Sequence, residues 1–482
     1  MKTQLALWSL VVITVLFGCK EEKKEVVTSE ATQEEKTELA PINDDVLETA
    51  VIYEANIRQY SPEGTFQEFT NDIPKLKELG VKVIWLMPVY PISMEKRKAT
   101  GDLMVSDIED PEERKKYLGS YYAVADYTAI NPEFGTMDDF RSLVDTAHDN
   151  GMYVILDWVP NHTGWDHEWI TEHPEFYTKN AEGEITDPLN EDGEPVGWAD
   201  VADLDYSNEK LQRAMIDEMK FWITEENVDG FRCDVAGSVP TEFWQKAIPE
   251  LREAKDIFML AEAWEPELLK ENLFEMAYAW EGHHLLNQIA KGEMNGTDFD
   301  TYMKKMDTDY EDNDILMNFI TNHDENSWNG TIEERMGDAA EAMLALSYAM
   351  PGMPLIYSGQ EYDMNHRLKF FEKDTIPKEK RKMWPKLQRL GELKNSVPAL
   401  NGGKDAASYE RIQTNDNAKI IAFSRKKGDS EVVLVINASD ATTSAALEIE
   451  GDYVDAFSDE NIFLSPSQSR EMGPWEYWLL VK

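Results

Sequence analysis

Three acidic residues, Asp234, Glu262 and Asp324, each follow a short apolar run in the sequence. The runs have the length of buried β-strands, and carboxylates at the carboxyl ends of successive strands are where a barrel of alternating strands and helices keeps its catalytic groups. Two such carboxylates, one acting as nucleophile and one as proton donor, are what cleavage of a glycosidic bond requires. The spacing of these residues therefore predicts a glycoside-cleaving site.

Apolar runs of strand length recur between residues 46 and 396. Helical stretches with apolar residues at i, i+3 and i+4 separate several of them, as at Leu211–Ile223 and Ala339–Met350. Alternating strands and helices indicate βαβ units and a parallel sheet, and eight units indicate a closed (β/α)8 TIM barrel, an α/β fold. The predicted strands are Val51–Ile57, Val81–Met87, Tyr153–Trp158, Val228–Cys233, Ile257–Ala261, Met276–Ala279, Ile315–Ile320 and Leu355–Tyr357.

One connection is much longer than the others. Residues 159–207, rich in Gly, Pro, Asp and Trp, join the predicted third strand to the next helix. A loop of that length inside a compact domain usually has a function, and we expect an inserted lid subdomain above the carboxyl ends of the strands. Trp165, Trp169 and Trp198 are candidates for stacking on sugar rings, with packing of the loop itself as the alternative.

Residues 397–482 have a different pattern from the barrel. Helical periodicity gives way to short β-rich runs separated by turn residues, which predicts a C-terminal antiparallel β-sandwich domain. The runs are Ile420–Ser424, Glu431–Ile436, Ser444–Ile449 and Trp475–Val481, and the breaks are Gly402-Gly403, Lys427-Gly428-Asp429 and Gly451-Asp452.

The formal net charge of the chain, −46, limits its partners. Phosphates would be repelled, so we expect no nucleic-acid partner and no binding to anionic membrane surfaces through charge. A polyanionic substrate is disfavoured for the same reason. A neutral polymer such as a glucan is indifferent to this charge.

Residues 1–19 have the pattern of an export signal. Met1-Lys2 opens the chain, an apolar run follows, and Gly18-Cys19 ends it. Leu16-Phe17-Gly18-Cys19 resembles a bacterial lipobox, in which the cysteine is lipidated, and a plain signal peptide is the alternative. Residues 20–45, rich in Glu, Lys and Thr, are expected to form a disordered tether. We therefore expect an exported protein, anchored at the outer membrane or cell surface only through lipid on Cys19.

From about Val46 to its C-terminus the chain resembles the α-amylase superfamily, glycoside hydrolase family thirteen. The motifs occur in the order found in that family, and the ordered set is far more specific than any single motif. They are Gly119-Ser120-Tyr121-Tyr122, Asp157-Trp158-Val159-Pro160-Asn161-His162, Ala202-Asp203-Leu204-Asp205-Tyr206, Gly230-Phe231-Arg232-Cys233-Asp234, Met259-Leu260-Ala261-Glu262-Ala263-Trp264, Phe319-Ile320-Thr321-Asn322-His323-Asp324 and Gly352-Met353-Pro354-Leu355-Ile356-Tyr357.

The resemblance implies a retaining hydrolase of α-1,4-glucosidic bonds in starch-like polysaccharides or maltodextrins. Asp234 is the implied nucleophile, Glu262 the implied proton donor, and Asp324 the implied ligand of the distorted sugar. Glu262 must then be neutral at rest, which requires a raised pKa. The implied substrate-binding residues are Arg232, which would hold the nucleophile ionised, His162 and His323, which would bond sugar hydroxyls, Tyr122, which would stack under the sugar, and Asp157, which would support them.

The chain departs from the family where calcium is concerned. Gly237-Ser238 stand where many calcium-dependent members carry Lys-His, whose His carbonyl binds the metal. Asn161 keeps its place as a candidate ligand, and Asp187, Asp192 and Asp200 supply further hard oxygen atoms in the lid segment. We therefore expect that no cofactor is required, we leave calcium open, and we assign no metal ligand.

Three other functions are compatible with these motifs. A transglycosylase would pass the glycosyl unit to another sugar, and a neopullulanase-like or pullulanase-like member would act on α-1,6 bonds; both would use the same catalytic residues. A surface glycan-binding protein without catalysis is the third alternative. Such a protein would be expected to lose the nucleophile or the acid, whereas Asp234 and Glu262 are both present.

Overall fold

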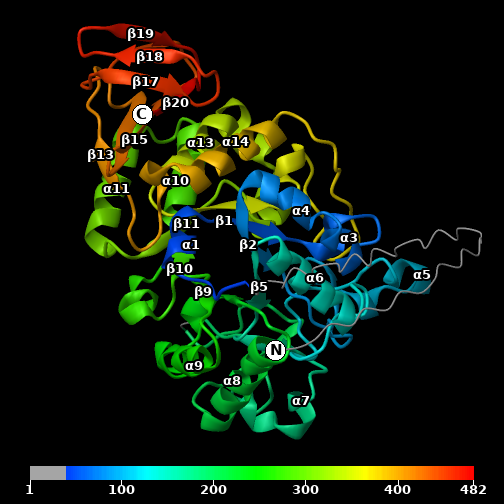
Figure 1. The fold of residues 1–482 in the computed structure, drawn as a ribbon. Helices are drawn as coiled ribbons and strands as arrows, with labels where there is room; N and C mark the ends of the chain where they lie inside the picture. The colour runs from blue at the N-terminus through cyan, green and yellow to red at the C-terminus, as the bar shows by residue number, and fades with distance from the viewer. Residues whose placement is uncertain (1–38, 191) are drawn as a thin grey trace, which may run out of the picture. The chain divides into compact units, whose positions relative to one another are not determined.

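Eight parallel strands close into a barrel in the computed structural model, which describes residues 39–190 and 192–482 (Figure 1). Around the barrel the strand order is β1-β12-β11-β10-β9-β8-β5-β2, with β2 paired again to β1. The eight strands predicted from the sequence are confirmed. Their bounds are β1 (Val51–Ala55), β2 (Val81–Leu86), β5 (Tyr153–Trp158), β8 (Gly230–Cys233), β9 (Phe258–Ala261), β10 (Met276–Tyr278), β11 (Ile315–Asn318) and β12 (Met353–Tyr357).

Successive residues of the barrel strands are buried on opposite faces. On β2, Val83 and Trp85 pack in one apolar cluster with Ile52 of β1, whereas Ile84 and Leu86 belong to the larger cluster that also contains the helices. A strand has a side-chain period of two, so these clusters are the inside and the outside of the barrel. Burial of both faces explains why the strands read as continuous apolar runs.

Several of the longer helices carry an apolar stripe and a capped N-terminal end. In α8 the side chains of Leu211, Met215 and Met219 are buried, and Asn208 caps the helix by accepting a hydrogen bond from the Lys210 N–H. The helices are α1 (Asp44–Thr49), α2 (Ile57–Tyr60), α3 (Phe66–Thr70), α4 (Ile73–Leu76), α5 (Pro111–Arg114), α6 (Met137–Asp149), α7 (Trp169–Glu172), α8 (Glu209–Thr224), α9 (Thr241–Ala254), α10 (Trp280–Ala290), α11 (Gly296–Asp309), α12 (Ile332–Met336), α13 (Ala340–Ala349) and α14 (Met383–Ser396).

Two short antiparallel ribbons lie in the connections between barrel elements. One pairs β3 (Lys98–Thr100) with β4 (Leu103–Met104), and the other pairs β6 (His162–Gly164) with β7 (Val201–Asp203) inside the long segment 159–207. Trp169 of that segment is 4% exposed and packs on Phe176, so its ring is used for packing. Trp198 is 42% exposed. That the segment acts as a lid stays a prediction.

The C-terminal strands form a six-stranded antiparallel sheet and a two-stranded sheet within the described residues, coloured orange to red in Figure 1. Ile421 and Phe423 of β14 share the main core with the barrel helices, and the alternate residues Ile420 and Ala422 share a second core with Ala445 of β16. The six-stranded sheet is therefore covered on both faces. The strands are β13 (Ser408–Arg411), β14 (Ile420–Lys427), β15 (Ser430–Asn437), β16 (Thr443–Ala446), β17 (Gly451–Asp455), β18 (Asn461–Leu464), β19 (Ser469–Met472) and β20 (Tyr477–Val481).

The folded part of the chain begins before the predicted boundary at residue 46. Asn43 caps α1, and Ile42 is buried in the cluster that fills the barrel. The predicted signal peptide, residues 1–19 with Cys19, and the tether up to residue 38 lie outside the described residues. Within residues 39–190 and 192–482, no helix has both the length and the apolar character needed to cross a bilayer.

Candidate active site

The three predicted carboxylates follow three barrel strands at their carboxyl ends. Asp234 comes directly after β8, Glu262 directly after β9, and Asp324 after β11. The backbone of the first two is held by the barrel itself: the Asp234 N–H donates to the Trp158 carbonyl (2.8 Å) and the Glu262 N–H to the Cys233 carbonyl (3.0 Å). Strand pairing thus fixes the backbone positions of Asp234 and Glu262.

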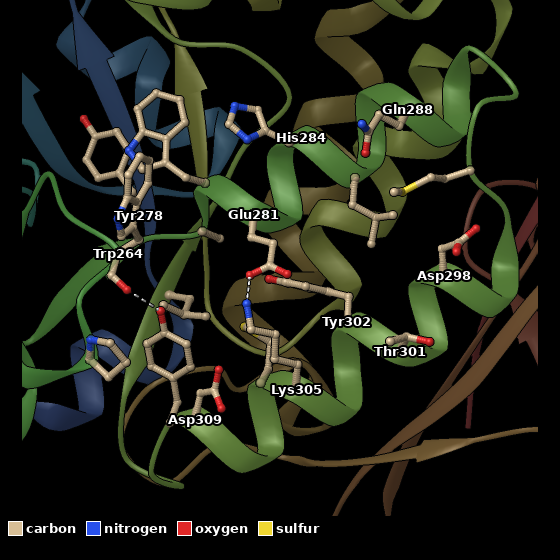
Figure 2. Close-up of a pocket in the computed structure, with 18 residues that line it drawn as sticks. Trp264, Tyr278, Glu281, His284, Gln288, Asp298, Thr301, Tyr302, Lys305 and Asp309 are labelled. Atoms are coloured by element: carbon tan, nitrogen blue, oxygen red, sulfur yellow. Dashed lines mark hydrogen bonds and ion pairs between the residues drawn. The ribbon is translucent and has the colours of Figure 1, made fainter.

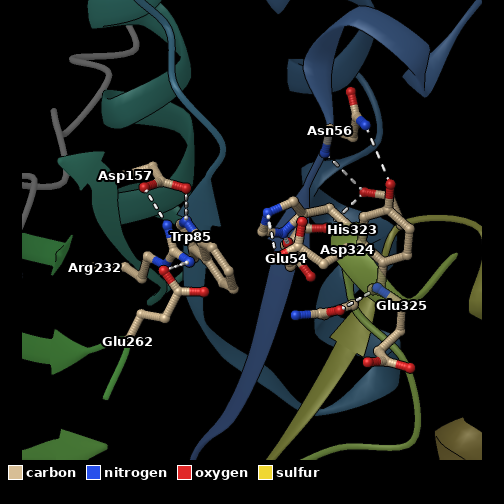
Figure 3. Close-up of polar contacts among 12 residues, drawn as sticks. Glu54, Asn56, Trp85, Asp157, Arg232, Glu262, His323, Asp324 and Glu325 are labelled. Carbon is tan, nitrogen blue, oxygen red and sulfur yellow. Dashed lines mark hydrogen bonds and ion pairs between the residues drawn. The ribbon is translucent and has the colours of Figure 1, made fainter. Parts of the chain in front are cut away.

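The guanidinium of Arg232 lies between the carboxylates of Asp157 and Glu262 (Figure 3). Its Nη1 donates to Asp234 Oδ1 (2.9 Å) and to Asp157 Oδ1 (2.7 Å), and its Nη2 forms an ion pair with Glu262 Oε2 (2.8 Å). Its Nε donates to the hydroxyl of Tyr278 (3.1 Å). Arg232 is fully buried, so this cation neutralises carboxylates in a place that water does not reach.

Burial changes the proton affinities of the two carboxyl groups next to Arg232. For Asp234, burial raises the pKa above its ordinary value, and Arg232 only partly opposes that effect. For Glu262, burial likewise raises the pKa, against the opposing effect of Arg232, to about 7. The Val235 N–H also donates to Glu262 Oε2 (2.8 Å). Glu262 can therefore hold a proton close to neutral pH, as a general acid must.

A second set of contacts connects Asp157 to His323. Trp85 Nε1 and the Tyr122 hydroxyl both donate to Asp157 Oδ2, each at 3.2 Å. The Tyr122 oxygen in turn lies 2.8 Å from His323 Nε2, and the two rings stack with centroids 5.6 Å apart. The predicted residues Tyr122, Asp157, Arg232 and His323 are thus parts of one hydrogen-bonded network with Asp234.

His323 carries its positive charge between two carboxylates. Its Nδ1 lies 2.5 Å from Glu54 Oε1, and its Nε2 lies 3.3 Å from Asp324 Oδ2. Burial alone would lower the pKa of His323, but Asp324 and Glu54 raise it to about 9. At neutral pH the ring is therefore protonated, and both of its nitrogen atoms are donors.

His162 differs from His323 in its charge. It is 3% exposed and starts β6, and burial lowers its pKa to about 4, against a small opposite effect of the Tyr122 backbone. Its Nδ1 lies 3.3 Å from Asn161 Nδ2. The rings of His162 and Trp198 are nearly perpendicular, and their centroids are 5.8 Å apart. His162 is therefore a neutral imidazole beside Tyr122.

Three residues of the network were missed by reasoning from the sequence: Glu54 on β1, Trp85 on β2 and Tyr278 on β10. Trp85 and Tyr278 lie within apolar runs and cannot be told from core residues by their pattern. Glu54 does leave a signal, because a carboxylate inside a buried strand needs a partner. The sequence does not say which partner that is.

Glu265, three residues after Glu262 in the chain, lies next to Gly237. A Cβ built on Gly237 would lie 2.8 Å from Glu265 Oε2, so this carboxylate fills the space that a side chain at position 237 would take. The Trp264 N–H donates to the same oxygen (3.1 Å). Where the family pattern has a lysine, this chain thus has Gly237 with the carboxylate of Glu265 beside it.

The calcium ligands suggested by the sequence do not form a single site in the described part of the chain. Asp200 Oδ1 lies 3.6 Å from the ammonium of Lys98, and Asp187 Oδ2 accepts from the Gly197 N–H. Among residues 39–190 and 192–482, no group of three or more His, Cys, Asp or Glu side chains is arranged to hold a metal ion. No chemical step below involves calcium.

Comparison with protein families gives one match that covers most of the chain. The model of the alpha amylase catalytic domain family matches residues 30–188 and 195–392. Among solved structures, a noncanonic maltogenic alpha-amylase from Thermotoga neapolitana is similar, with 27% sequence identity and a TM-score of 0.78 over 90% of this chain and 99% of that chain.

Curated relatives include hydrolases and transferases. An alpha-amylase of Haloarcula japonica is 24% identical over 86% of this chain and 59% of its own length. An alpha-1,4-glucan:maltose-1-phosphate maltosyltransferase of Rhodospirillum rubrum is 26% identical over 77% of this chain and 54% of its own length. The chain therefore spans little more than half the length of these relatives.

Proposed function

Because this chain belongs to the alpha-amylase catalytic domain family, we propose that it hydrolyses α-1,4-glucosidic bonds in starch-like polysaccharides or maltodextrins, with retention of configuration at the anomeric carbon. The relatives include hydrolases and transferases, so hydrolysis itself is part of the proposal. So are the bond type, the polymer and the mechanism.

One observation carries the mechanism: a single buried guanidinium contacts both Asp234 (2.9 Å) and Glu262 (2.8 Å). Retaining glycosidases need their two carboxyl groups about 5 to 5.5 Å apart, whereas inverting ones need about 6.5 to 9.5 Å to admit a water molecule. Carboxylates that share one guanidinium are held close together, which favours direct attack by one of them.

In the first step Asp234 attacks the anomeric carbon while the glycosidic bond breaks and Glu262 gives its proton to the departing oxygen. This forms a glycosyl ester on Asp234 and leaves Glu262 ionised. In the second step Glu262 takes a proton from water, whose oxygen attacks the anomeric carbon and releases Asp234. Both residues return to their starting states, so no other proton donor is needed.

The surrounding residues position the sugar and the nucleophile. Arg232 favours the ionised form of Asp234, which attack requires. Asp324, whose side chain is 35% exposed, can accept hydrogen bonds from ring hydroxyls beside the charged ring of His323 (3.3 Å). The ring of Tyr122 lies parallel to Phe370, with an interplanar angle of 10°, and provides the stacking surface.

Transfer to another sugar is the second candidate function, because curated relatives include a maltosyltransferase. Both reactions share the glycosyl ester on Asp234 and differ in whether water or a sugar hydroxyl attacks it. Trp264 and Glu265 follow Glu262 in the same loop, so they are candidates for contact with that acceptor.

The products decide between these functions. We would incubate the protein lacking residues 1–19, and its Asp234→Ala variant, with soluble starch, pullulan and maltotriose, and follow products by chromatography. Mixed maltodextrins from starch, absent with the variant, support the proposal. Panose or maltotriose from pullulan would indicate α-1,6 or neopullulanase-like action, and products longer than maltotriose would indicate transfer. No product from any substrate would contradict it.

We also propose that the protein is exported and anchored through lipid on Cys19. The support is the lipobox-like sequence Leu16-Phe17-Gly18-Cys19 at the end of an apolar run. A full-length protein with Cys19→Ala should lose incorporation of labelled fatty acid and detergent-dependent solubility. Equal labelling of both proteins would contradict the anchor.

A further inference from the structure

A pocket of about 610 Å³ lies between α10 and α11, beside the loop that follows Glu262 (Figure 2). Trp264 and Pro266 of that loop line one end, and Met294 before α11 also lines it. None of Asp234, Glu262 and Asp324 is among its lining residues. Pockets of about 300 to 1,000 Å³ hold small-molecule ligands, so this one has room for a short saccharide.

Aromatic rings form part of the pocket wall. Trp264 is 60% exposed, which is unusual for a residue that proteins normally bury. Its carbonyl accepts a hydrogen bond from the Tyr310 hydroxyl (3.0 Å), which ties the loop to the end of α11. Trp280 stacks on Tyr278 (centroids 5.2 Å apart) and on His284 (6.0 Å). The pocket therefore offers flat apolar surfaces that are already fixed in position.

The phenol of Tyr302 is part of the pocket wall. Tyr302 is 6% exposed. A Cβ on Gly282 of α10 would lie 2.6 Å from the Tyr302 hydroxyl oxygen. Glycine inside a helix is less favourable than alanine, and here its presence permits the close approach of Tyr302.

The pocket is lined by one lysine, Lys305, and by three carboxylates, those of Glu281, Asp298 and Asp309. Glu281 and Lys305 form an ion pair across the two helices, visible in Figure 2. Gln288 and Thr301 add uncharged donors and acceptors. A wall of aromatic faces with mixed donors and acceptors suits a ligand that has apolar faces and many hydroxyls. The chain's net charge of −46 disfavours an anionic one.

We propose that this pocket is a second binding site for a short segment of a neutral α-glucan, separate from the catalytic carboxylates. The choice of ligand rests on the proposed function. Tyr278 connects the two places, because it lines the pocket while its hydroxyl accepts a hydrogen bond from Arg232 (3.1 Å). A glucan bound here would lie beside Trp264, two residues after Glu262 in the chain.

The test is a count of bound maltotriose molecules. Maltotriose is titrated by calorimetry into the full chain carrying Asp234→Ala, which prevents turnover. The pocket variant adds His284→Ala and Gln288→Ala, which remove two side chains from the exposed side of α10. The matched control instead adds Lys304→Ala and Asp307→Ala, exposed residues of α11 that do not line the pocket.

We expect two maltotriose sites in the parent and in the control. In the pocket variant the second site should weaken at least about tenfold, because two hydrogen-bonding groups are lost. A further variant, Gly282→Ala, should do the same by displacing the Tyr302 hydroxyl. One site in every protein, or two unchanged sites in both pocket variants, would overturn the proposal. Absence of hydrolysis by the protein with Asp234 intact would instead contradict the proposed function, so the two failures are distinguishable.

Discussion

His323 and Glu54 lie 269 residues apart in the chain and 2.5 Å apart in space, Nδ1 to Oε1. Both are buried, and the carboxylate helps to keep the imidazole protonated up to a pKa of about 9. The contact joins β1 to the loop after β11, across the barrel interior. A residue of the first strand thus sets the charge of a residue beside Asp324.

Replacing Glu54 with Gln should lower the pKa of His323, because the negative charge is removed while a hydrogen-bond acceptor stays. His323 would then lose its proton at a lower pH. With an aryl maltoside, whose cleavage needs little protonation by Glu262, activity on the alkaline side should be lost at least about one pH unit earlier than in the parent. The pH dependence of kcat/KM measures this. Glu275→Gln, a buried glutamate paired with Arg252, is the control. An unmoved alkaline side in Glu54→Gln would refute the role of Glu54.

Asp234→Ala should reduce turnover by at least about 10⁴-fold, because no glycosyl ester can form. Arg232 keeps Asp157 and Glu262 as partners, so the thermal midpoint should change by only a few degrees. Activity and circular dichroism melting measured on the same preparation separate the two effects. Substantial residual activity would show that another residue is the nucleophile.

Glu262→Gln should slow the hydrolysis of natural glucans by about 10²–10⁴-fold. It should have little effect on the hydrolysis of an aryl maltoside, because a good leaving group needs little protonation. In the parent, activity on natural glucans should fall as pH rises through about 7, where Glu262 loses its proton. It should also fall in acid as Asp234 becomes protonated. Equal losses on both kinds of substrate would argue against the role of Glu262 as the acid.

Arg232→Gln should lower the free energy of unfolding by about 3–5 kcal/mol at pH 7, because it leaves buried carboxylates without their cation. The loss should be smaller at pH 5, since the raised pKa values of Asp234 and Glu262 allow them to become neutral there. Urea unfolding at the two pH values measures this. Arg213→Gln, at an exposed ion pair, should change stability by less than about 1 kcal/mol. A loss independent of pH would contradict the electrostatic account.

The barrel was predictable because its signals are local. A parallel strand buried on both faces is a continuous apolar run, and each run can be recognised without knowing its neighbours. Asp234 and Glu262 could be placed for the same reason, since each follows such a run directly.

Other features depend on neighbours that are distant in sequence. The pairing of Glu54 with His323 exists only once β1 and β12 close the barrel. The break predicted at Gly451-Asp452 is wrong, because β17 begins there and gains its partners from β18 and β20. The buried position of Ile42 likewise depends on the barrel-strand residues in its cluster, which its neighbours in the sequence do not reveal.

The anomeric form of the first product tests the mechanism most directly. Proton NMR spectra recorded within the first minutes of hydrolysis, before mutarotation, distinguish the two anomers of the newly formed reducing end. Direct attack by Asp234 followed by attack of water inverts the anomeric carbon twice, so the account predicts the α-anomer. Initial release of the β-anomer would mean a single displacement by water and would contradict Asp234 as the nucleophile.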